Sequence, residues 1–234
     1  MITEILRPKT VAEAVRAKSA PGAAWLGGGT WLSSGRDSTV TLLVSLEHLG
    51  LGSINTAGGT CTIGAMARFQ AIVDNAAVPG ALRRAAALTA SRTLRNMVTL
   101  GGELGLKPRD SAVIPVLVAL DATVSVAGKK KPVPIRRFLD DNPVGLVLAV
   151  SVPVERPAAV DAVSRTSHSP RSLVVAVTAD RIVVSDCQGQ VAVVPDPAAF
   201  APRPDMHASA AYKRYMIGVL VEDLRRSLSR EAER

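Results

Sequence analysis

The chain of 234 residues is 47% hydrophobic, so it can bury a sizeable core, and it exceeds an average single domain of about 100–150 residues. Its formal net charge of +8 would suit a nucleic-acid-binding protein, but only 3% of the residues are aromatic, most basic residues are dispersed, and no nucleic-acid-binding motif is present. The composition therefore excludes nucleic acid as a partner and favours two or three subdomains in one functional unit.

Cysteine and histidine are too scarce and too scattered to predict a metal site in this chain. Cys61 and Cys187 are far apart and neither belongs to a C-x-x-C pair, which argues against a zinc site, an iron–sulfur cluster or a disulfide framework. No apolar run approaches the roughly 20 residues of a membrane span, and the N-terminus lacks the pattern of a signal peptide. We expect a cytoplasmic protein without a membrane span, in which any metal chemistry belongs to a partner.

The N-terminal segment, to about residue 55, has the pattern of a small α/β unit. Thr10 and Glu13 form a capping box ahead of a helix that ends near Lys18. Residues 23–26 and 41–46 then have the composition of short buried strands.

Two glycine-rich segments carry the strongest chemical signal. The first is Trp25-Leu26-Gly27-Gly28-Gly29-Thr30-Trp31-Leu32, and the second is Thr99-Leu100-Gly101-Gly102-Glu103. Glycine lets backbone N–H groups approach an anion without obstruction, so two such turns could converge on one long diphosphate. A simple connecting turn is the alternative for either segment alone. Neither has the spacing of a Rossmann fingerprint or of a P-loop, so a different dinucleotide-binding fold is predicted.

The middle of the chain alternates strands and helices. A strand over residues 60–66 leads to helices near residues 68–75 and 82–94, immediately before the second glycine segment. An apolar segment over residues 111–120 follows, with Asp110 able to cap its N-terminus, and we expect it to form a wall behind the site. Residues 146–154 form a further strand, and Pro157, Ala158 and Ala159 mark a boundary.

The C-terminal part has the pattern of a three-stranded antiparallel meander closed by a helix. The three strands are predicted at residues 173–178, 181–186 and 191–194, followed by a proline-rich loop. The final helix is predicted to present one apolar stripe. Its members are Tyr212, Tyr215, Met216, Val219, Leu220, Leu224 and Leu228.

Taken together, three features resemble the flavin subunit of the molybdenum hydroxylases, the family of xanthine dehydrogenase and carbon monoxide dehydrogenase. They are the two glycine segments, the Arg95-Asn96-x-x-Thr99 approach to the second, and the terminal Ala211-Tyr212-Lys213-Arg214-Tyr215. The resemblance covers nearly the whole chain, and the short stand-alone flavin subunits of xanthine dehydrogenase-like and selenate-reductase-associated systems are the most similar.

The resemblance implies an α+β fold of the p-cresol methylhydroxylase or vanillyl-alcohol oxidase type. An FAD-binding domain would span residues 1–155, divided into subdomains of about 1–55 and 56–155, and a flavoprotein C-terminal domain would span residues 156–234. FAD would lie between the two α/β subdomains. Residues 25–32 match the first pyrophosphate loop and residues 99–103 the second, Asp110 matches an acidic contact on the adenosine side, and Leu148 an apolar contact near the isoalloxazine.

Three positions depart from the family pattern. Glu103 stands where Asn or Asp is usual, Ala162 where a lysine is frequent, and Thr89 where an aromatic side chain often flanks the ring. Because a carboxylate beside a diphosphate is repulsive, we expect Glu103 to accept a hydrogen bond from a ribose hydroxyl or from the backbone instead.

The function implied by the resemblance is electron transfer within a complex. In the family, FAD receives electrons from [2Fe-2S] clusters and passes them to an external acceptor such as NAD, while an iron–sulfur subunit and a molybdopterin-binding subunit carry the other cofactors. No catalytic residues are then needed in this chain. Two alternatives remain, a flavin-free scaffold subunit with the same fold, suggested by Glu103 and Ala162, and a self-contained flavoenzyme such as an enolpyruvyl-sugar reductase.

Overall fold

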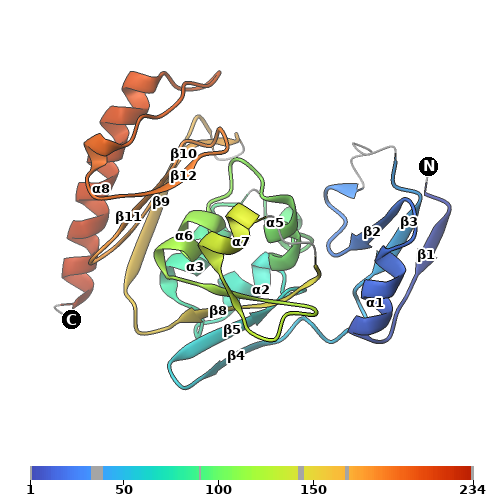
Figure 1. The fold of residues 1–234 in the computed structure, drawn as a ribbon. Helices are drawn as coiled ribbons and strands as arrows, with labels where there is room; N and C mark the ends of the chain where they lie inside the picture. Colours follow the sequence, from blue (N-terminus) through green and yellow to red (C-terminus); the bar gives the residue numbers. More distant parts are fainter. Residues whose placement is uncertain (1, 33–38, 90, 142–144, 167–168, 233–234) are drawn as a thin grey trace.

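The computed structural model describes residues 2–32, 39–89, 91–141, 145–166 and 169–232, and arranges them around three β-sheets. Figure 1 shows the N-terminal sheet at one end, the C-terminal sheet with its long helix at the other, and a group of helices over the central sheet between them. In these residues no helix combines the length and the apolar character needed to cross a membrane.

The N-terminal unit is a parallel sheet with one covering helix. Its strands are β1 (Glu4–Leu6), β2 (Ala23–Leu26) and β3 (Leu42–Ser45), in the order β1-β3-β2, and its helix is α1 (Val11–Lys18). The predicted N-cap is confirmed, because the Glu13 N–H donates to Thr10 Oγ1 at 3.2 Å. The Glu13 side chain accepts from the Lys9 N–H at 2.9 Å, one residue before the cap. This unit delivers the first glycine segment from the end of β2.

The central unit is an antiparallel sheet in the order β4-β5-β8-β6-β7, with helices packed on it. The strands are β4 (Ile54–Ala57), β5 (Thr60–Gly64), β6 (Thr123–Val126), β7 (Val133–Pro134) and β8 (Val147–Pro153). The helices are α2 (Phe69–Asp74), α3 (Gly80–Ala87), α4 (Arg92–Arg95), α5 (Leu100–Leu106), α6 (Val113–Ala119) and α7 (Ile135–Asp141).

Two helix predictions in this unit need correction. The helix predicted over residues 82–94 is two helices, because Ser91 caps α4 by accepting a hydrogen bond from the Leu94 N–H at 3.3 Å. The N-terminus of α6 is satisfied by Ser111 and not by Asp110, since the Ile114 N–H donates to Ser111 Oγ at 3.1 Å. Pro115 lies in the first turn of α6, where the missing N–H costs no helical hydrogen bond, and every residue of the helix is buried.

The C-terminal sheet is antiparallel and has one strand more than predicted. Its order is β12-β11-β10-β9, and the predicted meander strands are β10 (Arg171–Thr178), β11 (Ile182–Ser185) and β12 (Val191–Val194). The added strand β9 (Ala158–Ser164) begins where a boundary was expected. Its alanines gave a weak hydrophobic signal, yet Ala159 and Val163 pack toward one face and Ala158 and Ala162 toward the other.

Both faces of this sheet are covered. Val174 and Ala176 of β10 belong to the core shared with the central helices, whereas Val175 and Val177 face helix α8 (Ala210–Ala232). The predicted stripe of α8 is wrong at its start, because Tyr212 and Tyr215 are 46% and 69% exposed. A helix of 3.6 residues per turn presents Ile217, Leu220, Val221 and Leu224 to the sheet, and a short 3-10 helix, η2 (Pro197–Ala199), precedes it.

Lys213 fixes the start of α8 although it is a charged residue inside the protein. Its side chain is 1% exposed, and Nζ lies 2.8 Å from Asp205 Oδ2 and donates to the carbonyl oxygens of Asp186 and Arg203, each at 2.8 Å. Three acceptors match the three donors of an ammonium group, so the buried charge is fully paired.

We expect Lys213→Ala to destabilise the protein by about 3–5 kcal/mol, because it leaves the Asp205 carboxylate and two carbonyls without their shared donor. Urea unfolding at neutral pH measures the change. The matched control is Arg214→Ala at the next, exposed position, for which we expect a change within about 0.5 kcal/mol. Equal unfolding midpoints for the two variants would contradict the role assigned to Lys213.

Candidate functional site

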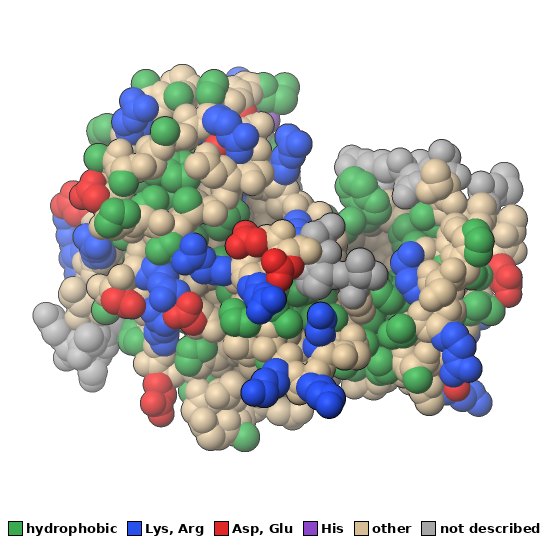
Figure 2. All heavy atoms as spheres, viewed as in Figure 1, with side chains coloured by type: hydrophobic (Ala, Val, Ile, Leu, Met, Phe, Trp, Pro, Cys, Tyr) green, Lys and Arg blue, Asp and Glu red, His purple; other side chains and the backbone are tan. Residues whose placement is uncertain are grey.

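A cavity of about 840 Å³ lies between the N-terminal unit and the rest of the molecule. Figure 2 shows the surface hollowed at this junction. The volume falls within the roughly 300–1,000 Å³ that is usual for cofactor and small-molecule sites. Both glycine segments line the cavity, which brings together residues that are far apart in the sequence.

Most residues predicted from the sequence line this cavity. They are Trp25, Gly27, Gly28, Gly29, Thr30, Trp31, Leu32, Thr99, Gly101, Gly102, Glu103 and Asp110. Leu26, Leu100 and Leu148 are not among the lining residues. Leu100 is fully buried in the central core, and Leu148 packs in the same apolar cluster as Leu146. The lining at the start of β8 comes from Gly145, Leu146 and Val147.

The first glycine segment offers unpaired donors. Among the described residues, the N–H groups of Gly27, Gly28 and Gly29 donate to no protein acceptor, and Gly29 has a φ of +72°, a left-handed conformation that suits glycine. Backbone N–H groups without partners are costly unless water or a ligand satisfies them. A run of three beside a cavity is therefore suited to an anion.

The glycines are also required by the way the two segments pack. A Cβ placed on Gly28 would lie 1.7 Å from the carbonyl oxygen of Met97, and one on Gly27 would lie 2.9 Å from Thr99 Oγ1. Substituting Gly28 therefore displaces the neighbouring backbone first, so a loss of ligand in such a variant would not isolate the phosphate contact.

The second glycine segment is not a free turn but the first turn of α5. The four N–H groups of Leu100–Glu103 already have protein acceptors. Leu100 N–H donates to Ala67 O at 3.0 Å, Gly101 N–H to Ala65 O at 2.7 Å, Gly102 N–H to Thr99 Oγ1 at 3.2 Å, and Glu103 N–H to Thr99 O at 3.0 Å. This segment therefore supplies a close, small-residue surface, while the donors available to an anion come from Gly27–Gly29.

Glu103 is a buried acid on the α5 side of the cavity. Its residue is 7% exposed, and Oε1 accepts a hydrogen bond from the Ser111 hydroxyl at 2.5 Å. The partner is thus a side-chain hydroxyl and not the backbone. Burial raises the pKa of Glu103 to about 7, although the Ser111 hydroxyl and the Arg171 guanidinium act in the opposite direction.

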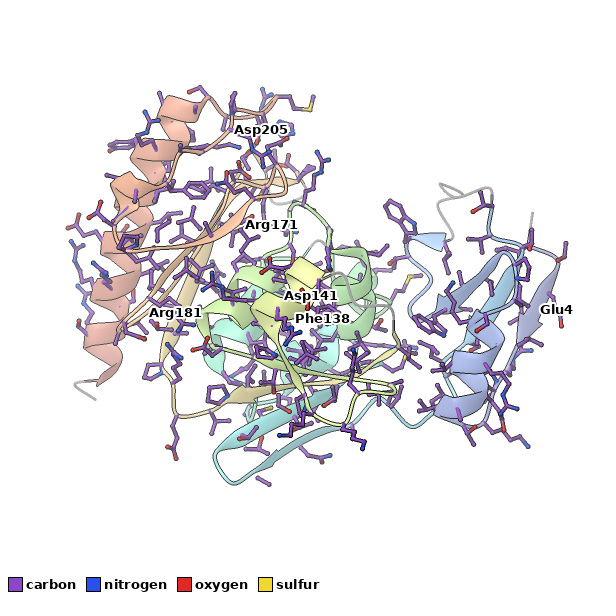
Figure 3. All side chains as sticks on the ribbon, viewed as in Figure 1. Glu4, Phe138, Asp141, Arg171, Arg181 and Asp205 are labelled. Carbon is purple, nitrogen blue, oxygen red and sulfur yellow. The ribbon has the colours of Figure 1, made fainter. Side chains whose placement is uncertain are left out.

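Arg171, at the start of β10, was missed by the sequence analysis and ties the C-terminal sheet to the cavity wall (Figure 3). Its Nε donates to the Asp110 carbonyl at 2.5 Å, Nη2 to Asp110 Oδ2 at 3.2 Å, and Nη1 to the Leu88 carbonyl at 2.6 Å. Asp110, in the loop between α5 and α6, is therefore paired with an arginine of the C-terminal sheet. A lone arginine after a proline carries no local signal of this role.

Lys18, Trp25 and Thr89 also line the cavity and could contact a ligand. Lys18 Nζ lies 5.9 Å from the centre of the Trp25 ring, while Trp25 Nε1 donates to the Ala14 carbonyl at 3.3 Å. Thr89 Oγ1 is buried with no protein hydrogen-bond partner, and this residue also lines the cavity. Within the described ranges, no group of three or more His, Cys, Asp or Glu side chains could hold a metal ion.

Comparison with known proteins identifies the family. Residues 1–155 match the family model described as the FAD-binding domain in molybdopterin dehydrogenase. The chain belongs to this family. It is also 31% identical to the uncharacterized protein YgfM of Escherichia coli K12, over 96% of this chain and 95% of YgfM.

Solved structures share the fold of the whole chain. Carbon monoxide dehydrogenase from Oligotropha carboxidovorans matches with a TM-score of 0.84 and 22% identity, covering 97% of this chain and 96% of that one. Quinoline 2-oxidoreductase from Pseudomonas putida 86 matches with a TM-score of 0.85 and 18% identity, covering 97% and 98%. The predicted FAD-binding fold of the molybdenum hydroxylase flavin subunits is therefore confirmed.

The residues of the cavity fit FAD. Unpaired backbone donors at Gly27–Gly29 suit its diphosphate, the cavity volume suits a dinucleotide, and the orphaned Thr89 hydroxyl offers a hydrogen bond inside an otherwise largely apolar wall. The chain is an FAD-binding subunit of the molybdenum hydroxylase type, and we call the cavity the FAD pocket from here on.

A substitution at Gly101 tests whether the close packing of α5 is needed for flavin binding. A Cβ on Gly101 would lie 2.8 Å from the Cβ of Ala65 and 3.0 Å from its carbonyl oxygen, whereas one on Gly218, in helix α8, meets nothing within 4 Å. We expect Gly101→Ala to lower flavin occupancy and to cost about 1–3 kcal/mol of stability through overpacking. Gly218→Ala, on the exposed face of α8 and away from the pocket, should keep full occupancy and gain up to about 1 kcal/mol. Flavin absorbance and urea unfolding check both, and equal occupancy in the two variants would contradict the assignment.

The raised pKa of Glu103 makes stability depend on pH. In the flavin-free protein the folded state binds the proton more tightly than the unfolded chain, whose ordinary value is 4.5. The stabilisation is full below that value and is lost as the pH rises through about 7, by on the order of 3 kcal/mol relative to Glu103→Gln, which does not titrate. Urea unfolding from pH 4.5 to 8.5 measures the difference. Parallel curves for the two proteins would show that Glu103 titrates normally.

Proposed function

We propose that this chain is the electron-transfer flavin subunit of a molybdenum hydroxylase complex. Its FAD would receive electrons from iron–sulfur clusters on another polypeptide and pass them to an external acceptor such as NAD. The observation that carries the proposal is the FAD pocket itself, with its three unpaired glycine N–H groups, in a chain of the FAD-binding molybdopterin dehydrogenase family.

FAD supplies the redox chemistry when bound, since a flavin exchanges one or two electrons, and the residues of this chain hold and orient it. In this proposal the N–H groups of Gly27, Gly28 and Gly29 bind the diphosphate, and Lys18, which also lines the pocket, adds a positive charge. Leu146 and Val147 take the apolar contact to the isoalloxazine that the sequence had assigned to Leu148.

The chain's own residues favour a division of labour between subunits. Its two cysteines, Cys61 and Cys187, are both buried, and burial raises the pKa of the Cys187 thiol to about 12, which disfavours the thiolate that binds metals. We therefore assign the [2Fe-2S] clusters and the molybdopterin to partner subunits of a cytoplasmic hetero-oligomer. Residues 1–155 would form the FAD-binding domain and residues 156–234 the C-terminal flavoprotein domain.

We expect the isolated chain to be yellow, with one FAD per chain, and to show no hydroxylase activity toward purines, aldehydes or carbon monoxide. Absorbance spectra, flavin release and activity assays on the purified chain check this. Affinity purification of the tagged chain from its native cell should recover iron and molybdenum with it.

Tagged variants of the chain separate flavin binding from assembly with the partner subunits. The tagged Gly101→Ala chain should recover the same partners while carrying less flavin than the Gly218→Ala chain. A chain that binds no flavin but recovers both metals would favour the flavin-free scaffold. A flavin-loaded chain recovered alone, whose deletion abolishes no activity, would contradict membership in a complex.

A further inference from the structure

Glu103 is the one acidic residue of α5, and it faces the pocket of an anionic cofactor. A carboxylate in that position would repel the diphosphate, and the energy of such repulsion grows as water is excluded. The surroundings of Glu103 show how the site can avoid this conflict.

The Ser111 hydroxyl fixes the roles of the two carboxyl oxygens. Ser111 Oγ accepts a hydrogen bond from the Ile114 N–H at 3.1 Å, so its own proton is available for Glu103 Oε1, 2.5 Å away. Oε1 is therefore an acceptor. Oε2 has no hydrogen-bond partner among the described residues and is not a fully buried atom, so it is the oxygen left open on the pocket side.

The charges around Glu103 come from two other segments. Asp110, in the loop between α5 and α6, opposes ionisation, and Arg171 of β10 favours it while also pairing with Asp110. Lys107, at the end of α5, donates to the carbonyls of Phe138 and Leu139 in α7. The strands packed on α5, β5 and β8, contain no charged residue and a single titratable one, Cys61. Burial outweighs the favourable charge, and the pKa rises to about 7.

We propose that Glu103 takes part in FAD binding as the neutral acid, with a proton on Oε2 that donates a hydrogen bond to an acceptor oxygen of the diphosphate–ribose portion. The inference rests on the proposed FAD function. A proton from solvent forms the Oε2–H bond, no other covalent bond changes, and the carboxyl charge is removed. FAD binding is then linked to proton uptake at Glu103.

Calorimetric titration of FAD into the flavin-free full chain tests this linkage. At pH 8, in buffers of different ionisation enthalpy, binding to the wild type should take up nearly one proton, and affinity should weaken roughly tenfold for each pH unit above 7. Glu103→Gln keeps a donor at the same place and cannot titrate. It should bind FAD with no proton uptake and no pH dependence between pH 6 and 8.5.

Two further variants keep the test decisive. Glu222→Gln, an exposed carboxyl on α8, should behave as the wild type. Ser111→Ala removes the hydrogen bond that favours ionised Glu103, so the midpoint of the pH dependence should move upward. This variant also decides the question if Glu103→Gln fails to fold.

The failures of the two proposals are distinguishable. Wild-type affinity that is independent of pH, a folded Glu103→Gln that no longer binds FAD, or a downward shift in Ser111→Ala would each overturn the role of Glu103 alone. A wild-type chain that binds no FAD at any pH would overturn the proposed function as well.

Discussion

The close approach of two backbone segments is the contact on which the FAD pocket depends. Gly27 and Gly28 run so near to Met97 and Thr99 that any side chain at Gly28 would overlap the Met97 carbonyl. This contact joins the N-terminal unit to the central unit at the rim of the cavity, where the Gly27–Gly29 amides have no acceptor among the described residues. The absence of side chains thus has two effects: it allows the two backbones to pack closely, and it keeps the N–H groups accessible to a ligand.

The opposite wall of the pocket depends on a polar network that spans two sheets. Arg171, from the C-terminal sheet, donates to Asp110 and to the Leu88 carbonyl, and Asp110 is followed directly by Ser111, the partner of Glu103. The C-terminal part of the chain is therefore not an independent appendage, because Arg171 at the start of β10 contributes to the lining of a site built mainly by residues before 155. Buried polar groups of this kind fix a geometry only while every partner is present.

The sequence predicted the elements with local signals well. The N-cap of α1, the three meander strands and the position of both glycine segments at the pocket followed from composition, periodicity and glycine placement, together with the family resemblance. The errors arose where distant contacts decide the outcome. Strand β9 depends on helices packed against its alanines, and the exposure of Tyr212 and Tyr215 depends on which face of α8 meets the sheet.

The second glycine segment shows most clearly why pattern alone could not assign roles within the site. Both segments have glycines and a hydroxyl residue in series, and both lie at the pocket, yet among the described residues the glycine N–H groups of the first segment have no acceptor, whereas those of the second are paired. In the second, the hydroxyl of Thr99 and the carbonyls of Ala65 and Ala67 use the first amides of α5. In the binding mode proposed above, an acidic side chain at the fourth residue of this helix is tolerable because burial favours its neutral form. The positive potential for the diphosphate would then come from the N–H groups of Gly27–Gly29.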